Sequence, residues 1–214
     1  PAGGWAANTR PMKIHFHEGD LPAGVDFGRI AAIDSETLGL NPLRDGLCLA
    51  QISAGDGHVH IVRFNRKTYS APNFVRLLED PETIKLFHYA RFDVGVFKHY
   101  LAAKTNPIWC TKLASRLVRT YTDRHGLKDL VKEVLDVDLS KQQQSSDWGA
   151  EKLSDAQLSY AASDVLHLHK LQRALESMLV REGRLEWAKA CFAFIGTRAE
   201  LDLGGWAAED IFAH

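Results

Sequence analysis

The sequence predicts an α/β fold in which helices flank a central mixed β-sheet. In the first half, apolar runs alternate with Gly, Pro, Asn and Asp, which is typical of strands joined by turns. The middle alternates strand and helix patterns, and helical periodicity dominates from Thr111 onward. Strands first, then mixed units, then helices indicate an α/β domain.

The elements are expected in a definite order. Strands are predicted over residues 13–17, 30–34, 47–53 and 58–64, as an antiparallel meander. A helix over 71–79, a strand over 84–88, a helix over 91–102 and a strand around 108 follow. The last helices are predicted over 111–120, 126–136 and 154–182, the final one starting at a capping box of Ser154 and Gln157.

Length and composition are those of an ordinary globular protein. The chain has 214 residues, 45% hydrophobic and 25% charged, which suffices for one domain with a substantial core. We expect a single domain over residues 12–214 with a C-terminal helical tail, because the Gly/Ala-rich residues 1–11 indicate an upstream or artificial segment. The formal net charge of -1 means that any site for a polyanion must be local.

Cysteine usage and hydropathy favour a cytoplasmic protein. Cys48, Cys110 and Cys191 lie far apart without a Cys-x-x-Cys pair, which fits a reducing compartment. No apolar run approaches the roughly 18 residues that a membrane helix needs, and the segment after Met12 has no apolar signal core. No membrane partner is expected.

Two carboxylates, Asp34 and Glu36, stand at the end of the strand predicted over residues 30–34. Asp34 and Glu36 stand at i and i+2, so both side chains point to one side if the extended geometry persists. On its own, such a pair of acidic residues at the end of a strand is more often a solvated part of a turn than a metal site. Asp93 falls in the first turn of the next predicted helix, where it binds a cation or merely complements the helix dipole.

A third group of candidate site residues lies on the long predicted helix. Tyr160 and Asp164, at i and i+4, share one helix face, although a Tyr at this spacing is more often a core or rim residue. Together with Asp34, Glu36 and Asp93 they supply hard oxygen donors that suit Mg²⁺ or Mn²⁺. No Gly-rich phosphate loop or Cys/His ligand pattern competes. The sequence therefore predicts a catalytic metal site.

The order D-x-E, H-x-A-x-x-D and Y-x-x-x-D resembles the DEDD superfamily of 3′-to-5′ exonucleases, in the tyrosine branch that includes ribonuclease D. Segments 120–128, 141–148 and 201–214 look most like nano-RNase C, a family that degrades diribonucleotides and assembles as a ring-shaped octamer. The resemblance implies a ribonuclease H-like fold. It also implies two divalent cations, Mg²⁺ or Mn²⁺, with Tyr160 as the catalytic phenol and as metal ligands Asp34, Glu36, Asp93 and Asp164.

The candidate substrate-binding residues are Thr37, Leu38, Gly39 and His88. Leu38 can place an apolar wedge against or between bases, and the alternative is a buried turn leucine. His88 can contact the substrate, and a satisfied structural histidine is nearly as frequent.

The resulting hypothesis is a cytoplasmic exoribonuclease that hydrolyses very short RNA, especially diribonucleotides, to nucleoside 5′-monophosphates. Only about fifty residues follow Asp164, too few for the extra helical domains of larger ribonuclease D proteins. Trimming of longer RNA 3′ ends, or exonuclease action on DNA ends, is the alternative among enzymes. A nucleic-acid-binding scaffold without turnover is a third hypothesis, against which the complete five-residue set argues. A homo-octamer is expected from the resemblance alone.

Three further groups of residues either have several possible roles or are expected to be purely structural. A solvated helix face, a phosphate contact or a subunit seam would each explain the basic residues Arg116, Arg119, Arg124, Lys128 and Lys132. The aromatic tail from Cys191 must bury its side chains on its own domain or on a neighbouring subunit. We expect the pairs His58/His60 and His167/His169 to be structural rather than metal ligands.

Overall fold

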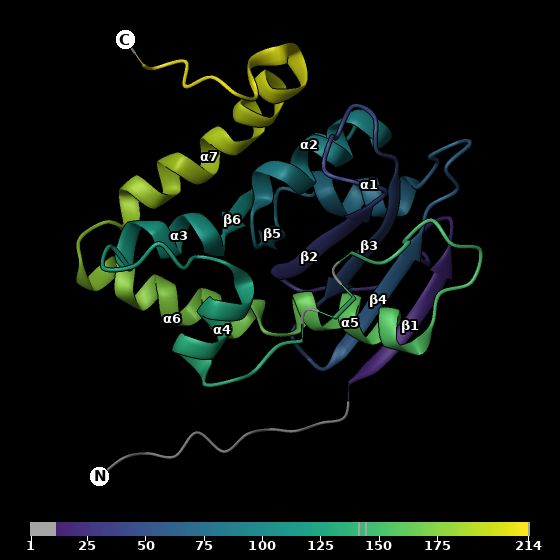
Figure 1. Cartoon of the computed structure of the whole chain (residues 1–214), viewed down its shortest axis with the longest axis horizontal. Coiled ribbons are helices and arrows are strands. Elements are labelled where there is room, and N and C mark those ends of the chain that lie inside the picture. Colours follow the sequence, from purple (N-terminus) through teal and green to yellow (C-terminus); the bar gives the residue numbers. More distant parts are fainter. Residues whose placement is uncertain (1–11, 141, 144, 214) are drawn as a thin grey trace.

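The computed structural model describes residues 12–140, 142–143 and 145–213, so the prediction for residues 1–11 lies outside the described residues. A six-stranded sheet with the order β1-β4-β3-β2-β5-β6 forms its centre (Figure 1). The strands are β1 (Lys13–Glu18), β2 (Ile30–Thr37), β3 (Leu47–Ser53), β4 (His58–Arg63), β5 (Ile84–Phe87) and β6 (Ile108–Cys110). The helices are α1 (Pro72–Glu79), α2 (Ala90–Leu101), α3 (Thr111–Val118), α4 (Leu127–Leu135), α5 (Asp155–Leu166), α6 (Leu168–Arg181) and α7 (Leu185–Leu201), followed by a π-helical turn, η1 (Asp202–Trp206).

The sheet is mixed, which confirms the predicted fold class. β3 pairs antiparallel with both β2 and β4, while β5 pairs parallel with β2 and β6. The predicted antiparallel meander is wrong for β1, which pairs parallel with β4 at the sheet edge. Short connections join β2 to β3 and β3 to β4, as antiparallel neighbours allow. The longer segment between β1 and β2 instead lets the chain place β2 away from β1, so that β4 and β3 lie between them.

The core is built around β3, whose seven residues are all buried. It is mostly apolar because helices and neighbouring strands surround it, although Gln51 and Ser53 are buried with the apolar residues. α5 packs against β2, β3 and β4, and α2 packs against β3, β5 and β6. These two helices come from different parts of the chain, and both carry predicted site residues.

The long helix predicted over 154–182 is wrong as one element, because it consists of α5 and α6, separated at His167. The predicted capping box of α5 is confirmed: Gln157 N donates to Ser154 Oγ (3.2 Å), and Ser154 N donates to Gln157 Oε1 (3.0 Å). His169 lies 2.9 Å from the Ile30 carbonyl oxygen through Nε2. This tertiary contact fixes the start of α6 beside β2, and periodicity could not reveal it.

The basic residues after β6 do not form one solvated face. Arg119 is only 1% exposed, because its guanidinium donates to Ser115 Oγ (2.9 Å) and the Arg124 carbonyl (2.8 Å) and forms an ion pair with Glu133. Its inclusion in a solvent-facing group was therefore wrong. Arg119 instead ties α3 to the following loop and to α4.

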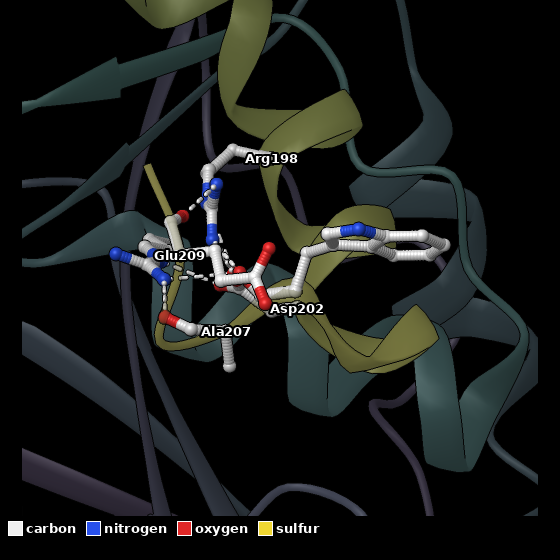
Figure 2. Close-up of polar contacts among 6 residues, drawn as sticks. Arg198, Asp202, Ala207 and Glu209 are labelled. Atoms are coloured by element: carbon white, nitrogen blue, oxygen red, sulfur yellow. Dashed lines mark hydrogen bonds and ion pairs between the residues drawn. The ribbon is translucent and has the colours of Figure 1, made fainter. Parts of the chain in front are cut away.

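The C-terminal segment folds back on α2 through ion pairs centred on Asp202 (Figure 2). Arg91 and Arg198 both pair with this carboxylate. Arg91 also donates to the Ala207 carbonyl (2.9 Å), and Arg198 donates to the Glu209 carbonyl (3.2 Å). The backbone after α7 is thereby held near the start of α2.

The tail buries only part of its aromatic surface. Phe192 and Ile195 of α7 are buried, and Phe192 packs against Trp109 with ring centroids 4.9 Å apart. Trp206 is 47% exposed and Phe212 74% exposed. Thus α7 belongs to this core, whereas the residues after it leave apolar surface open. Within the described residues, none of the helices is both long and apolar enough to cross a membrane.

Candidate active site

The acidic site is built on β2 and completed by α5. Asp34 and Glu36 lie within β2 rather than after it, because the strand continues to Thr37 by pairing with β3. Their i, i+2 spacing therefore places both carboxylates on one face. One carboxylate oxygen each from Asp34, Glu36 and Asp164 lie within 4.8 Å of one another. Three predicted ligands from distant parts of the chain thus converge.

Asp93 reaches the cluster from the first turn of α2. It is 3% exposed, and Ser35 Oγ donates to its Oδ1 over 2.6 Å. Burial and then the charge of Asp34 raise the pKa of Asp93. Asp93 thus contacts β2 at the residue between Asp34 and Glu36, although it is not among the three carboxylates whose oxygens converge within 4.8 Å. Ser35 was not predicted; the signal for it is a small polar residue between two site carboxylates.

The site is a crowded anionic cluster. Burial raises the pKa of Asp34 to about 7, and burial together with the charges of Asp34, Asp164 and Asp93 raises the pKa of Glu36 to about 10. Burial, followed by the charge of Asp34, raises the pKa of Asp93 and Asp164 well above the usual range. Across the described part of the chain, no Lys or Arg forms an ion pair with these four carboxylates.

This donor set fits hard divalent cations. Carboxylate oxygens are the ligands that Mg²⁺ and Mn²⁺ favour, and a cation would supply the positive charge that the protein does not provide. Carboxylates as close as these otherwise remain partly protonated, because each negative charge disfavours the next. The side chains that would hold the cations are Asp34, Glu36, Asp93 and Asp164.

Tyr160 lies one helical turn before Asp164 on α5, so the phenol and the carboxylate share one face of the helix. Burial, together with the neighbouring carboxylates, raises the pKa of Tyr160 further above its usual value of 10, so the phenol is neutral at pH 7. Trp148 is buried beside it, with ring centroids 6.1 Å apart. The Trp148 ring, which was not predicted as a site residue, therefore helps to hold the phenol in place.

The loop after β2 presents Leu38 to solvent. Leu38 is 51% exposed, so the alternative of a buried turn leucine is wrong. The Thr37 hydroxyl donates to the Gly39 carbonyl, and a Cβ on Gly39 would lie 2.3 Å from Asp45 Oδ2. Asp45 in turn accepts from Asn41 N (2.9 Å). Thr37, Gly39 and the unpredicted Asp45 thus shape the loop that carries Leu38.

His88 follows β5 immediately and is engaged within the protein. Its Nδ1 lies 2.8 Å from the Thr111 hydroxyl. Burial, with a smaller contribution from Lys112, lowers the pKa of His88 to about 3, so the ring is neutral. The contact supports a structural role, and substrate binding by His88 stays a prediction.

Fold and site together define a class of nuclease. A family model described as 3′-5′ exonuclease matches residues 27–180. The chain therefore belongs to the 3′-5′ exonuclease family, which confirms the expectation drawn from its carboxylate motifs.

Within that family, the chain is similar to NrnC of Brucella melitensis, as the resemblance to nano-RNase C predicted. It is 53% identical to the structure of NrnC with bound Mg²⁺, with a TM-score of 0.91 over 95% of this chain and 100% of that one. It is 55% identical to the structure of NrnC bound to pGG, with a TM-score of 0.92 over 95% of this chain and 99% of that one.

Ribonuclease D proteins are more distant relatives. The chain is 34% identical over 168 residues to ribonuclease D of Gluconacetobacter diazotrophicus, a match that covers 78% of this chain and 42% of the relative. The chain thus spans less than half the length of that curated relative. The likeness to Escherichia coli RNase D, at 23% identity and a TM-score of 0.71, shows a shared fold.

Proposed function

We propose that this protein is a metal-dependent 3′-to-5′ exoribonuclease that hydrolyses very short RNA, especially diribonucleotides, to nucleoside 5′-monophosphates. The observation that carries the proposal is the convergence of Asp34, Glu36 and Asp164 oxygens within 4.8 Å, beside Asp93 and Tyr160, in a member of the 3′-5′ exonuclease family. We infer a cytoplasmic location, with which the free thiols of the three cysteines agree.

The four carboxylates would hold two Mg²⁺ or Mn²⁺ ions. When bound, such a pair supplies positive charge at the attacking and leaving oxygens of an in-line displacement. We assign Asp34 as the residue that contacts both cations, because it converges with Glu36 and Asp164 and its charge also raises the pKa of Asp93, after the larger effect of burial. The Mg²⁺ bound to NrnC of Brucella melitensis supports the choice of metal.

Tyr160 orients the attacking water. A phenol that stays neutral at pH 7 is a poor general base, but it can hold a water molecule by a hydrogen bond. Its place one helical turn before Asp164 puts the phenol on the helix face that also presents this carboxylate. The residue therefore contributes positioning rather than charge.

A preference for short RNA rests on two observations. Leu38 offers an exposed apolar side chain just after the acidic strand, where it can pack against a base. The related NrnC of Brucella melitensis was solved with pGG. Tight binding of long RNA would require a long electropositive track on the protein surface, and neither observation points to one.

The test compares initial rates on 5′-labelled RNA of two and seven residues and on matched DNA, with Mg²⁺ or Mn²⁺. We expect the two-residue RNA to be hydrolysed fastest. Faster hydrolysis of the seven-residue RNA would favour ribonuclease D-like trimming, and equal rates on DNA would favour a general exonuclease. Binding of all four substrates without products would support a scaffold that lacks turnover.

We also propose that the protein forms the octameric ring expected from the nano-RNase C resemblance. The exposed Trp206 and Phe212 supply apolar surface that a neighbouring subunit could cover. Sites facing a shared channel would exclude structured RNA and so favour small substrates. A monomer in light scattering at micromolar concentration would contradict the ring.

A further inference from the structure

Four histidines form a ladder across the two strands at one edge of the sheet. His15 and His17 come from β1, and His58 and His60 come from β4. β1 and β4 run parallel, with His15 directly paired with His60. Because alternate residues of a strand share a face, all four imidazoles project from the same side of the sheet.

This side is opposite to the acidic site. Asp34 is paired with Gln51 of β3, and Gln51 is paired with Ile61 of β4, so these three side chains share one face. Ile61 follows His60 directly and therefore points away from it. The sheet itself separates the histidine ladder from the nuclease carboxylates.

The ring nitrogens already converge in pairs. His15 Nε2 lies 2.8 Å from His58 Nδ1, and His17 Nε2 lies 3.0 Å from His60 Nδ1. Two nitrogens bound cis to one metal, at bond lengths of about 2.05 Å and an angle near 90°, stand about 2.9 Å apart. The spacing within each pair therefore matches that of two ligands of one ion.

The rings are held in this arrangement before any ion binds. His15 stacks on both His58 and His60, with centroids 5.1 and 4.7 Å apart, and His17 stacks on His60 at 5.2 Å. The edge of Phe27 packs against His60 at 5.4 Å. These ring contacts hold the four imidazoles side by side on this face of the sheet.

We propose that this histidine ladder is a second metal site, which binds Ni²⁺ or Cu²⁺ rather than Mg²⁺, in place of the purely structural role that the sequence led us to expect for His58 and His60. Imidazole nitrogen suits these ions, whereas Mg²⁺ prefers the oxygen donors on the other face. His15 and His58 hold the ion, because His58 is the solvent-exposed member and leaves room for water ligands. His60 and His17 support His15 by stacking.

Binding needs a change of tautomer and a rotation of both rings, because the two nitrogens of the hydrogen-bonded pair point at each other, whereas both must point at a bound ion. The hydrogen shared between His15 Nε2 and His58 Nδ1 is lost from that side, and the same ring takes up a proton on its other nitrogen, so both facing nitrogens present lone pairs with no net proton release. The ion then joins β1 to β4. It would stabilise the edge strand, whose pairing with the sheet otherwise rests on β4 alone.

The experiment is equilibrium dialysis of the full chain against Ni²⁺ at pH 8, with excess Mg²⁺ present throughout to occupy the carboxylates. We expect wild-type protein to bind Ni²⁺, and a His15→Ala/His58→Ala double variant to lose at least about tenfold in affinity. His99→Ala removes an exposed histidine of α2 and is the matched control, expected to bind as wild type does. Circular dichroism verifies that each variant is folded.

Thermal denaturation gives an independent readout. Ni²⁺ should raise the Tm of wild-type and His99→Ala protein in the presence of Mg²⁺ and leave that of the double variant unchanged. Equal Ni²⁺ affinity in wild type and the double variant would overturn the proposal. An equal loss in His99→Ala would overturn it as well, because binding would then reflect scattered surface histidines.

Discussion

Replacing Asp164 by Asn should change activity and stability in opposite directions. The substitution keeps the size of the side chain and its place on α5 but deletes one of three charges whose oxygens converge. Catalysis loses a metal ligand, while the metal-free protein loses a source of electrostatic repulsion. A purely structural role for Asp164 would not separate these two effects.

The size of the stabilisation follows from the crowding of the carboxylates. Two unit charges 4.8 Å apart repel by about 3.5 kcal/mol at an effective dielectric constant near 20. Proton uptake already relieves much of this, because the pKa values of Asp34 and Glu36 are raised to about 7 and about 10. We therefore expect Asp164→Asn to stabilise the metal-free protein by about 1–2 kcal/mol at pH 8, which raises Tm by roughly 2–8 °C.

The assays are thermal denaturation in EDTA at pH 8 and steady-state hydrolysis of a diribonucleotide in Mg²⁺. We expect kcat/KM to fall at least about 1000-fold, equivalent to roughly 4 kcal/mol of transition-state stabilisation. Asp155→Asn, which removes an exposed carboxylate from the same helix, is the matched control and should keep full activity. Full turnover by Asp164→Asn in Mg²⁺, or an unchanged or lower Tm in EDTA, would refute the assignment.

Three further substitutions or conditions test other parts of the site and fold. Tyr160→Phe should lower kcat about 10- to 100-fold with little change in substrate affinity, because it removes an orienting hydroxyl; weaker binding with unchanged turnover would count against that role. Gly39→Ala should raise KM about tenfold with a smaller effect on kcat, since its Cβ would displace the Asp45 carboxylate and move the Leu38 loop; unchanged kinetics would show that the loop does not bind substrate. In EDTA, the folded protein should lose about 1–2 kcal/mol from His60 as pH falls from about 6.5 to about 4, because a ring whose pKa is lowered in the fold binds protons more readily when unfolded. Acid denaturation of wild type against His60→Gln measures this, and identical pH profiles would contradict it.

The candidate site could be predicted from sequence because each of its parts has a local signature. Asp34 and Glu36 follow an apolar strand at a spacing that puts both on one face, and Tyr160 and Asp164 follow the helical repeat. These rules hold whatever the tertiary structure is. Residues such as Ser35 and Trp148 were missed as site residues because their importance depends on which partner the fold brings to them.

The errors in the fold have the same origin. Alternation and turn residues located β1 correctly, but its parallel pairing with β4 depends on where the chain crosses the sheet. Helical periodicity runs through His167 without a break, and the contact of His169 with Ile30 that accompanies the start of α6 is tertiary. Arg119 looked solvated because arginine usually is, yet Glu133 and the Arg124 carbonyl satisfy it in the interior.

The placement of the carboxylates explains why the rest of the fold is so thoroughly packed around them. Crowding four acids without a cation destabilises the folded state, so the strand that carries two of them must be held by interactions elsewhere. β2 lies between the fully buried β3 and the parallel β5, and α2 and α5 bring the other two acids to it.

Metal binding relieves the repulsion among these carboxylates, so Mg²⁺ should protect the protein more strongly as pH rises and the carboxylates lose their protons. The difference in Tm between Mg²⁺ and EDTA should accordingly be larger at pH 8.5 than at pH 6, and a difference that shrinks as pH rises would argue that the ions bind elsewhere.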